Sequence, residues 1–149
     1  MEQTIAVASD HGGRILKQKI IEALQDSGIS VRDFGVPFDD ATSVDYPDLA
    51  AKVAHSVTNG ETNRGILVCG TGIGMSIAAN KVPGVRAALV WDEFTAKMAR
   101  QHNDANVLCL GERVINHDRA VTFVNLWLQS EFEGSRHLRR LDKIKQLES

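Results

Sequence analysis

The stretch VCGTGIGMSIAANK, residues 68–81, places a cysteine directly before three glycines at alternate positions. Gly70, Gly72 and Gly74 allow a sharp turn that gathers main-chain N–H groups at the start of a helical pattern, and such a group of donors favours an anion. Cys69 ends the preceding apolar run beside this positive potential, which favours the thiolate form of a cysteine. The pattern therefore favours a thiol that acts as a base or a nucleophile next to an anion-binding turn.

Other interpretations of this stretch stay open. The glycines can form a purely structural turn, and Cys69 can be a small buried hydrophobe, as we expect for Cys109. A dinucleotide site is less consistent with the sequence, because the G-x-G-x-x-G fingerprint needs a third glycine where Met75 stands.

Two histidines have neighbours suited to proton transfer. His11 follows Asp10 at the end of the first apolar run, and His102 lies in the peptide QHND, residues 101–104. General acid or base catalysis and a structural hydrogen bond are both compatible with His102. The spacing of Asp10, His11 and His102 does not indicate a metal site, so we expect no bound metal.

A basic segment lies near the C-terminus. Arg136 and Arg140 are four residues apart and share one face of the expected helix, where they can clamp a phosphate group. Arg139, Lys143 and Lys145 occupy the same segment, so a solvated basic face is the alternative.

Apolar runs and amphipathic helical patterns alternate along most of the chain. The expected strands are residues 4–9, 29–34, 64–70, 85–91 and 105–111, and the helical patterns cover 14–28, 46–60, 72–81, 92–104 and 116–132. This alternation predicts an α/β fold with a parallel sheet covered on both faces. Ligands of such sheets bind outside the carboxyl ends of the strands, which is where Cys69, Asp10 and His11 lie. The acidic, turn-rich residues 35–48 are the longest irregular segment and can border a site.

The overall composition sets limits on the partners. A chain of 149 residues with a net charge of -2 predicts a single domain, residues 1–149, without the charge pattern of a nucleic-acid-binding or membrane-binding protein. No apolar run approaches the roughly 18 residues that span a bilayer, and the first residues lack a signal-peptide pattern. We therefore expect a cytoplasmic protein with two reduced cysteines and no disulfide.

Seven segments together resemble the type B ribose-5-phosphate isomerases. They are SDHGG, DYPDLA, GILVCGTGIGMSIAANK, VRAAL, ARQHNDANVL, GERV and EGSRHLRRL, and they run from the first expected strand to the basic C-terminal segment. The resemblance implies a Rossmann-like three-layer sandwich around a five-stranded parallel sheet. It also implies an aldose-ketose isomerase of the non-oxidative pentose phosphate pathway, which interconverts ribose 5-phosphate and ribulose 5-phosphate through an enediolate without any cofactor.

The resemblance assigns roles to individual residues. Cys69 would carry a proton between two sugar carbons, Thr71 would hydrogen-bond the sugar oxygens, and His102 would open the sugar ring with Asp10 nearby. Main-chain N–H groups around Gly70, Gly72 and Gly74 would hold the enediolate oxygen. The remaining binding residues implied by the family are His11, Arg113, Arg136 and Arg140 for phosphate, Asn103 for sugar oxygens and Tyr46 for the pocket wall.

The family relationship also implies a homodimer or tetramer whose sites are shared between subunits. One subunit would supply Asp10, His11 and Cys69, while the other supplies His102, Asn103, Arg136 and Arg140 with a C-terminal segment, about residues 134–149, that reaches its partner.

Some alternatives remain at this stage. Some family members have a glutamate at the position of Met75 and lack the cysteine, so this chain belongs to the cysteine branch. Isomerisation of allose or galactose 6-phosphate and a non-catalytic sugar-phosphate sensor both stay open.

Overall fold

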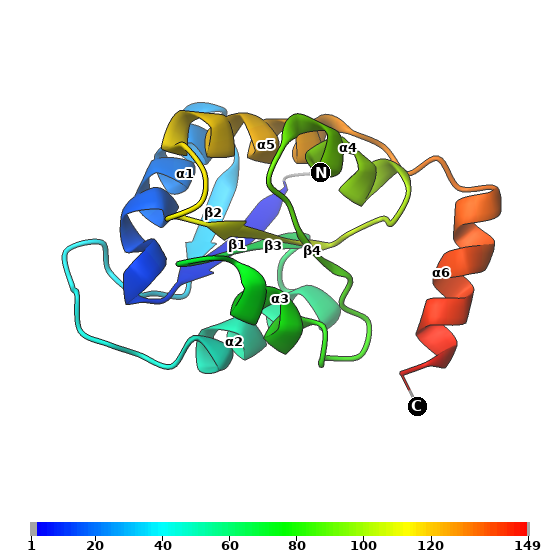
Figure 1. The fold of residues 1–149 in the computed structure, drawn as a ribbon, viewed down its shortest axis with the longest axis horizontal. Coiled ribbons are helices and arrows are strands. Elements are labelled where there is room, and N and C mark those ends of the chain that lie inside the picture. The colour runs from blue at the N-terminus through cyan, green and yellow to red at the C-terminus, as the bar shows by residue number, and fades with distance from the viewer. Residues whose placement is uncertain (1–2, 149) are drawn as a thin grey trace.

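Residues 3–148 are described by a computed structural model and form a five-stranded, all-parallel sheet between two layers of helices (Figure 1). Met1, Glu2 and Ser149, which belong to the expected domain, lie outside the described residues. The sheet order is β2-β1-β3-β5-β4. The strands are β1 (Thr4–Ser9), β2 (Ser30–Asp33), β3 (Arg64–Cys69), β4 (Ala87–Leu89) and β5 (Val107–Gly111).

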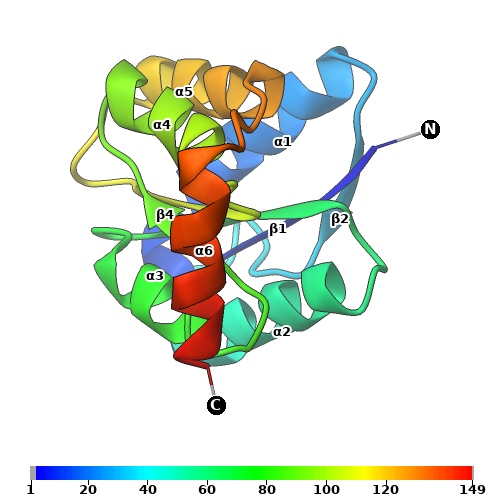
Figure 2. The ribbon, with the colours of Figure 1, turned by 90° about the vertical axis from the view of Figure 1, so that its right-hand side faces the viewer.

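Helices cover both faces of the sheet, as the sequence predicts (Figures 1 and 2). Trp127 and Phe123 are completely buried in the core on one face, and Met75 and Val53 are completely buried on the other. The three-layer α/β fold is thus confirmed. One face carries α1 (Arg14–Asp26), α4 (Glu93–Gln101) and α5 (His117–Gln129), and the other carries α2 (Tyr46–Thr58) and α3 (Ile73–Ala79).

The order of the strands creates a switch point between β1 and β3. After β1 the chain adds β2 on one side, and then adds β3 on the other side of β1. Parallel pairing of Ser9 with Val68 aligns the carboxyl ends of the two strands. Ligands bind at such switch points because the loops leaving the two strands diverge there. The fold therefore brings the loop after Ser9 next to the turn after Cys69.

Several elements are shorter than the sequence patterns predicted. The helical pattern over residues 92–104 ends as a helix at Gln101, because Asp104 has a φ of 46° and cannot continue it. The expected strand over residues 85–91 is reduced to Ala87–Leu89 at the edge of the sheet, where only β5 pairs with it.

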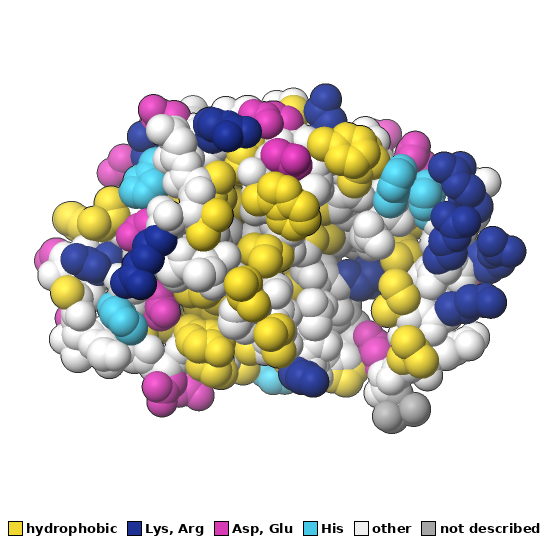
Figure 3. Space-filling model, viewed as in Figure 1, with side chains coloured by type: hydrophobic (Ala, Val, Ile, Leu, Met, Phe, Trp, Pro, Cys, Tyr) yellow, Lys and Arg dark blue, Asp and Glu magenta, His cyan; other side chains and the backbone are white. Residues whose placement is uncertain are grey.

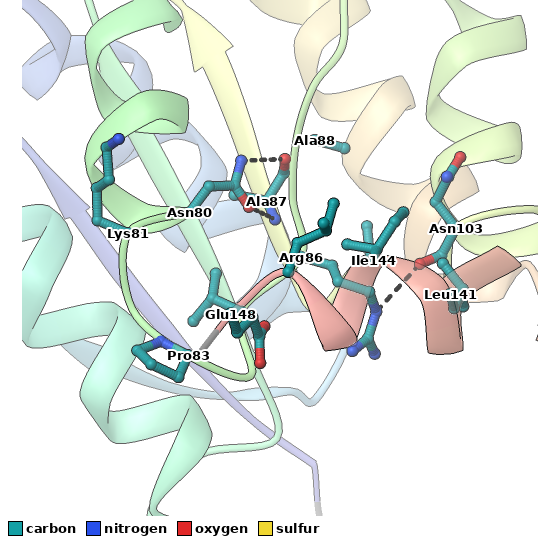
Figure 4. Close-up of a pocket in the computed structure, with 13 residues that line it drawn as sticks. Asn80, Lys81, Pro83, Arg86, Ala87, Ala88, Asn103, Leu141, Ile144 and Glu148 are labelled. Atoms are coloured by element: carbon teal, nitrogen blue, oxygen red, sulfur yellow. Dashed lines mark hydrogen bonds between the residues drawn. The ribbon is translucent and has the colours of Figure 1, made fainter.

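Helix α6 (Arg136–Gln146) stands beside the β4 edge of the sandwich, outside the two covering layers (Figures 1 and 2). Leu141 and Ile144 face the body and help to line a cleft of about 610 Å³ (Figure 4). Lys and Arg side chains gather along the outer side of this helix (Figure 3). Within residues 3–148, no helix has the length and hydropathy that crossing a membrane requires.

Candidate active site

The turn between β3 and α3 surrounds the sulfur of Cys69. This side chain is 5% exposed, and the main-chain N–H of Gly72 donates a hydrogen bond to its Sγ at 3.1 Å. Gly72 has a φ of 79°, and a Cβ there would lie 2.5 Å from Leu89 Cδ1, so only glycine fits. A main-chain donor that points at sulfur stabilises negative charge on it. The turn thus places a buried thiol against the main-chain N–H of Gly72.

Thr71 lies at the exposed tip of the same turn. Its Oγ1 accepts a hydrogen bond from the N–H of Ile73 at 3.2 Å. The hydroxyl hydrogen of Thr71 is therefore free to donate to a ligand above the turn.

The loop after β1 packs directly against this turn. A Cβ on Gly12 would lie 3.5 Å from the main-chain nitrogen of Gly70, and one on Gly13 would lie 2.6 Å from the carbonyl oxygen of Val68. Asp10 is 8% exposed, and its Oδ1 accepts from the N–H of Gly12 at 2.9 Å. The Asp10 carboxylate is consequently held at the same edge of the sheet as Cys69.

His11 is tied to the irregular segment between β2 and α2. Its Nδ1 accepts from the main-chain N–H of Val44 at 3.4 Å. Because Nδ1 acts as an acceptor, Nε2 carries the hydrogen of the neutral ring and is available as a donor to an anion. The segment of residues 35–48 thus borders the site through this contact.

Tyr46, the first residue of α2, lies over the start of α3. A Cβ on Gly74 would come within 2.4 Å of Tyr46 Cζ and 2.6 Å of its hydroxyl oxygen. The ring therefore occupies the space that any side chain at position 74 would need, and it forms a wall beside the glycine turn.

Arg113 follows β5 and completes this group. Its main-chain N–H donates to the carbonyl oxygen of Gly70 at 3.0 Å, and its guanidinium lies 3.6 Å from where a Gly70 Cβ would be. The preceding residue, Glu112, donates its N–H to the Cys69 carbonyl at 2.9 Å. A permanent positive charge consequently lies beside the glycine turn.

The other predicted site residues lie at the opposite edge of the sheet. Helix α4 starts after the carboxyl end of β4 and ends before the amino end of β5, so His102, its C-terminal cap, is at the amino edge. Asn103 follows it, and Arg136 and Arg140 are exposed on α6 nearby. One chain therefore does not bring these four residues to Cys69.

The backbone after His102 is held in an unusual conformation by two arginines. Asp104 has a positive φ, and its carboxylate contacts Arg100 Nη1 at 2.7 Å. Arg86 donates from Nε to the carbonyl oxygen of Asn103 at 3.2 Å and from Nη2 to that of Asp104 at 2.9 Å. Left-handed backbone at a residue other than glycine is costly and marks functional positions. These contacts hold the backbone of Asn103 and Asp104, directly after His102.

Two residues next to His102 were not singled out from the sequence. The His137 ring stacks on the His102 ring with centroids 4.1 Å apart and planes 17° apart. Glu133 Oε1 lies 3.4 Å from His102 Nε2 and 3.7 Å from His137 Nε2. Burial, with the neighbouring His102 as a second cause, lowers the pKa of His137, which favours its neutral form. The only sequence signal for this pair is the spacing of four between Glu133 and His137.

Cys109, the second thiol, lies in the core and not at the site. It is fully buried, and this burial raises the pKa of its thiol far above the ordinary value, with Cys69 as a smaller cause. The Cys109 thiol is therefore protonated and unreactive, which agrees with the expected packing role.

The contact between Tyr46 and position 74 gives a measurable prediction. Gly74→Ala should lower the free energy of unfolding by about 1 kcal/mol, because overpacking against the ring outweighs the better helix propensity of alanine. In a Tyr46→Ala background the same substitution should be neutral or stabilising. Urea unfolding of the four proteins measures this coupling, and equal effects of Gly74→Ala in both backgrounds would contradict the contact.

Fold and site together define an α/β protein of the sugar-phosphate isomerase class, with a thiol and a glycine turn at the switch point of a parallel sheet. The family model described as Ribose/Galactose Isomerase matches residues 5–144, and the chain belongs to this family.

Named relatives cover almost the entire chain. Ribose-5-phosphate isomerase B of Escherichia coli is 44% identical over 97% of this chain and 95% of its own length. The structure of ribose-5-phosphate isomerase B from Clostridium thermocellum is 51% identical with a TM-score of 0.95, and covers 98% of this chain and 97% of that one. The Mycoplasma genitalium enzyme, solved with bound ribulose-5-phosphate, is 48% identical with a TM-score of 0.93, covering 99% of this chain and 97% of its own.

Proposed function

We propose that this protein interconverts ribose 5-phosphate and ribulose 5-phosphate. The observation that carries the proposal is the Cys69 sulfur, held by the Gly72 N–H inside a glycine turn at the sheet's switch point. A proton next to a carbonyl group can be removed only where the developing oxyanion meets fixed donors, and this turn supplies a base and donors within six residues. The Mycoplasma genitalium relative, which binds ribulose 5-phosphate, supports the choice of substrate.

The chemistry follows from the position of these groups. The Cys69 thiolate takes the proton from C2 of the open-chain aldose, and the electrons move toward the C1 carbonyl oxygen to form the enediolate. Main-chain N–H groups of residues 70–74 and the Thr71 hydroxyl stabilise that oxygen and relay a proton between O1 and O2. The Cys69 thiol then returns its proton to C1, which gives the ketose. One oxyanion donor typically contributes about a hundredfold or more to the rate.

The phosphate group would be bound by cations from two directions. We assign His11 and Arg113, which lie at the carboxyl edge of the sheet, to one side of it. Arg136 and Arg140, exposed on α6, are assigned to the other side. A phosphate that carries nearly two negative charges matches this set of donors.

A second copy of the chain would complete the site as a homodimer. Ile73 and Ile77 on α3 are 52% and 57% exposed and four residues apart, so they form an apolar stripe next to the Cys69 turn. We propose that this stripe docks into the cleft between α6 and the β4 edge of a second copy (Figure 4). The cleft is lined by Asn103, so docking brings Cys69 of one copy toward His102 and Asn103 of the other. The C-terminal segment of about residues 134–149 would thereby reach its partner.

The same proposal places the enzyme in the cytoplasm. A catalytic cysteine must remain a free thiol, and both cysteines of this chain are unpaired in the described residues. Reducing compartments preserve such thiols, whereas oxidising ones convert them to disulfides.

Isomerisation of a hexose 6-phosphate, of allose or galactose, is the alternative within the same family. Initial rates of ketose formation distinguish a pentose from a hexose substrate. They are measured on ribose 5-phosphate, allose 6-phosphate and galactose 6-phosphate at equal concentration. We expect ribose 5-phosphate to react fastest. A faster reaction of a hexose phosphate would change the assigned substrate, and no ketose from any of these sugars would contradict the isomerase assignment.

A further inference from the structure

The contacts around His102 reveal more than an exposed histidine at the end of a helix. One flat face of its ring lies against His137, whose side chain is 6% exposed, and its edge points at the Glu133 carboxylate. His137 Nε2 is buried and has no hydrogen-bond partner. A buried polar atom without a partner is costly, so the ring is kept in this place at some expense of stability.

Backbone contacts on both sides of Glu133 fix the position of this residue. The N–H of Glu133 donates to the carbonyl oxygen of Gln101 at 3.0 Å, which joins the α5–α6 connection to the end of α4. Gly134 and Ser135 both have a positive φ, of 68° and 55°, and turn the chain sharply into α6. His137, the second residue of α6, follows this turn, and its Nε2 lies 3.7 Å from Glu133 Oε1, so the turn brings the carboxylate and the stacking ring together.

We propose that Glu133 and His137 are positioning residues that hold His102 as the proton donor for opening the sugar ring. This inference rests on the ring-opening role proposed for His102. The Glu133 carboxylate lies 3.4 Å from Nε2 of His102 and attracts the protonated ring, which orients the ring and leaves Nδ1 to face the substrate. The neutral His137 ring packs against one flat face of the His102 ring, and it adds no second positive charge beside a protonated His102.

The ring-opening step balances with these groups. Nδ1–H of protonated His102 donates its proton to O4 of the furanose as the C1–O4 bond breaks. Asp10 of the other subunit accepts the proton of the C1 hydroxyl group, whose oxygen becomes the aldehyde oxygen. His102 ends neutral with its Nε2–H still directed at Glu133, in the way that a carboxylate orients a catalytic histidine elsewhere.

A metal ion is a less consistent occupant of the same cluster. His102, Glu133 and His137 offer ligand atoms within 4.8 Å of one another. However, an imidazole binds metal through a lone pair in the plane of its ring, and the nearly parallel rings direct these lone pairs alongside one another. Convergence on one ion would require the stack to break.

The test separates ring opening from enolisation. Turnover of saturating ribose 5-phosphate requires both steps, whereas ribulose 5-phosphate has no ring, and exchange of its C1 hydrogen with solvent deuterium needs only the Cys69 side. NMR in D₂O follows this exchange, and a ketose assay follows turnover. Glu133→Gln should lower kcat from ribose 5-phosphate by roughly 10- to 100-fold, which is part of the roughly 100- to 10,000-fold that a general acid contributes, while exchange stays within about threefold of wild type.

Matched variants identify the role of each group. Glu131→Gln, an exposed glutamate of the same segment, should behave as wild type. His137→Phe keeps a flat ring and should retain kcat within about threefold, whereas His137→Ala should resemble Glu133→Gln. Thermal unfolding verifies that each variant is folded.

Three results would overturn the inference. Turnover and exchange that fall together in Glu133→Gln would indicate a merely structural role, and unchanged turnover would remove Glu133 from the reaction. A chelator that alters kcat of the wild type but not of Glu133→Gln would make the cluster a metal site. In contrast, a wild-type protein without turnover or exchange would contradict the proposed function itself.

Discussion

Cys69→Ala should abolish isomerisation while the protein still binds ribulose 5-phosphate. The substitution removes the only group in the glycine turn that can accept a carbon-bound proton, so kcat should fall by about 1,000-fold or more. The Gly72 N–H, the Thr71 hydroxyl and Arg113 remain to bind oxygen and phosphate. A ketose assay measures turnover, and isothermal titration calorimetry should show an affinity within about fivefold of wild type, because the thiol contributes little to ground-state binding.

Cys109→Ala provides the matched control. Its sulfur lies fully buried in β5 and its pKa is raised by burial, so turnover should be preserved. Removing the buried sulfur should cost about 1 kcal/mol of stability. If Cys69→Ala turned over substrate at the wild-type rate, the thiol would be a packing residue and the protein would fit the sugar-phosphate sensor alternative.

Most of the fold could be predicted from the sequence, because every strand except the exposed edge strand β2 is a short apolar run and the longer helices have an amphipathic stripe. These local patterns fix the order of the elements, and the requirement to cover both faces of a parallel sheet fixes the layers. The ends of elements were less predictable. The helix that ends at Gln101 is followed by Asp104 in a left-handed conformation, which a distant residue, Arg86, and a local one, Arg100, hold together.

The candidate site could be predicted where it is local and could not where it depends on distant contacts. The Cys69 turn, its glycines and Asp10 follow strand ends, whose position in such folds is general. Apart from the family resemblance, no sequence pattern around positions 46 and 74 indicates that the Tyr46 ring covers Gly74. The contact of Glu133 with His102 joins segments about 30 positions apart, and histidine and glutamate are common on exposed helices.

Mixing two inactive variants should restore activity if the site is shared between subunits. Cys69→Ala and His102→Ala are each expected to be inactive, since each lacks one part of the machinery. In one chain these residues lie at opposite edges of the sheet. The five residues of β5 rise about 3.3 Å each, so the two edges are roughly 15 Å apart. A mixed dimer contains one site with Cys69 from one chain and His102 from the other.

Random pairing makes this recovery quantitative. Half of the dimers in an equimolar mixture are mixed and each has one intact site of two, so activity should reach about a quarter of wild type after subunit exchange. Mixing wild type with the double variant Cys69→Ala/His102→Ala sharpens the argument. If the site is shared, every mixed dimer is inactive and only the wild-type dimers remain, which are about a quarter of all dimers and give about a quarter of the full activity. If the site is built within one chain, every wild-type chain stays active and about half of the activity remains. Native mass spectrometry establishes the exchange, and no recovery in the first mixture together with half activity in the second would place the complete site in a single subunit.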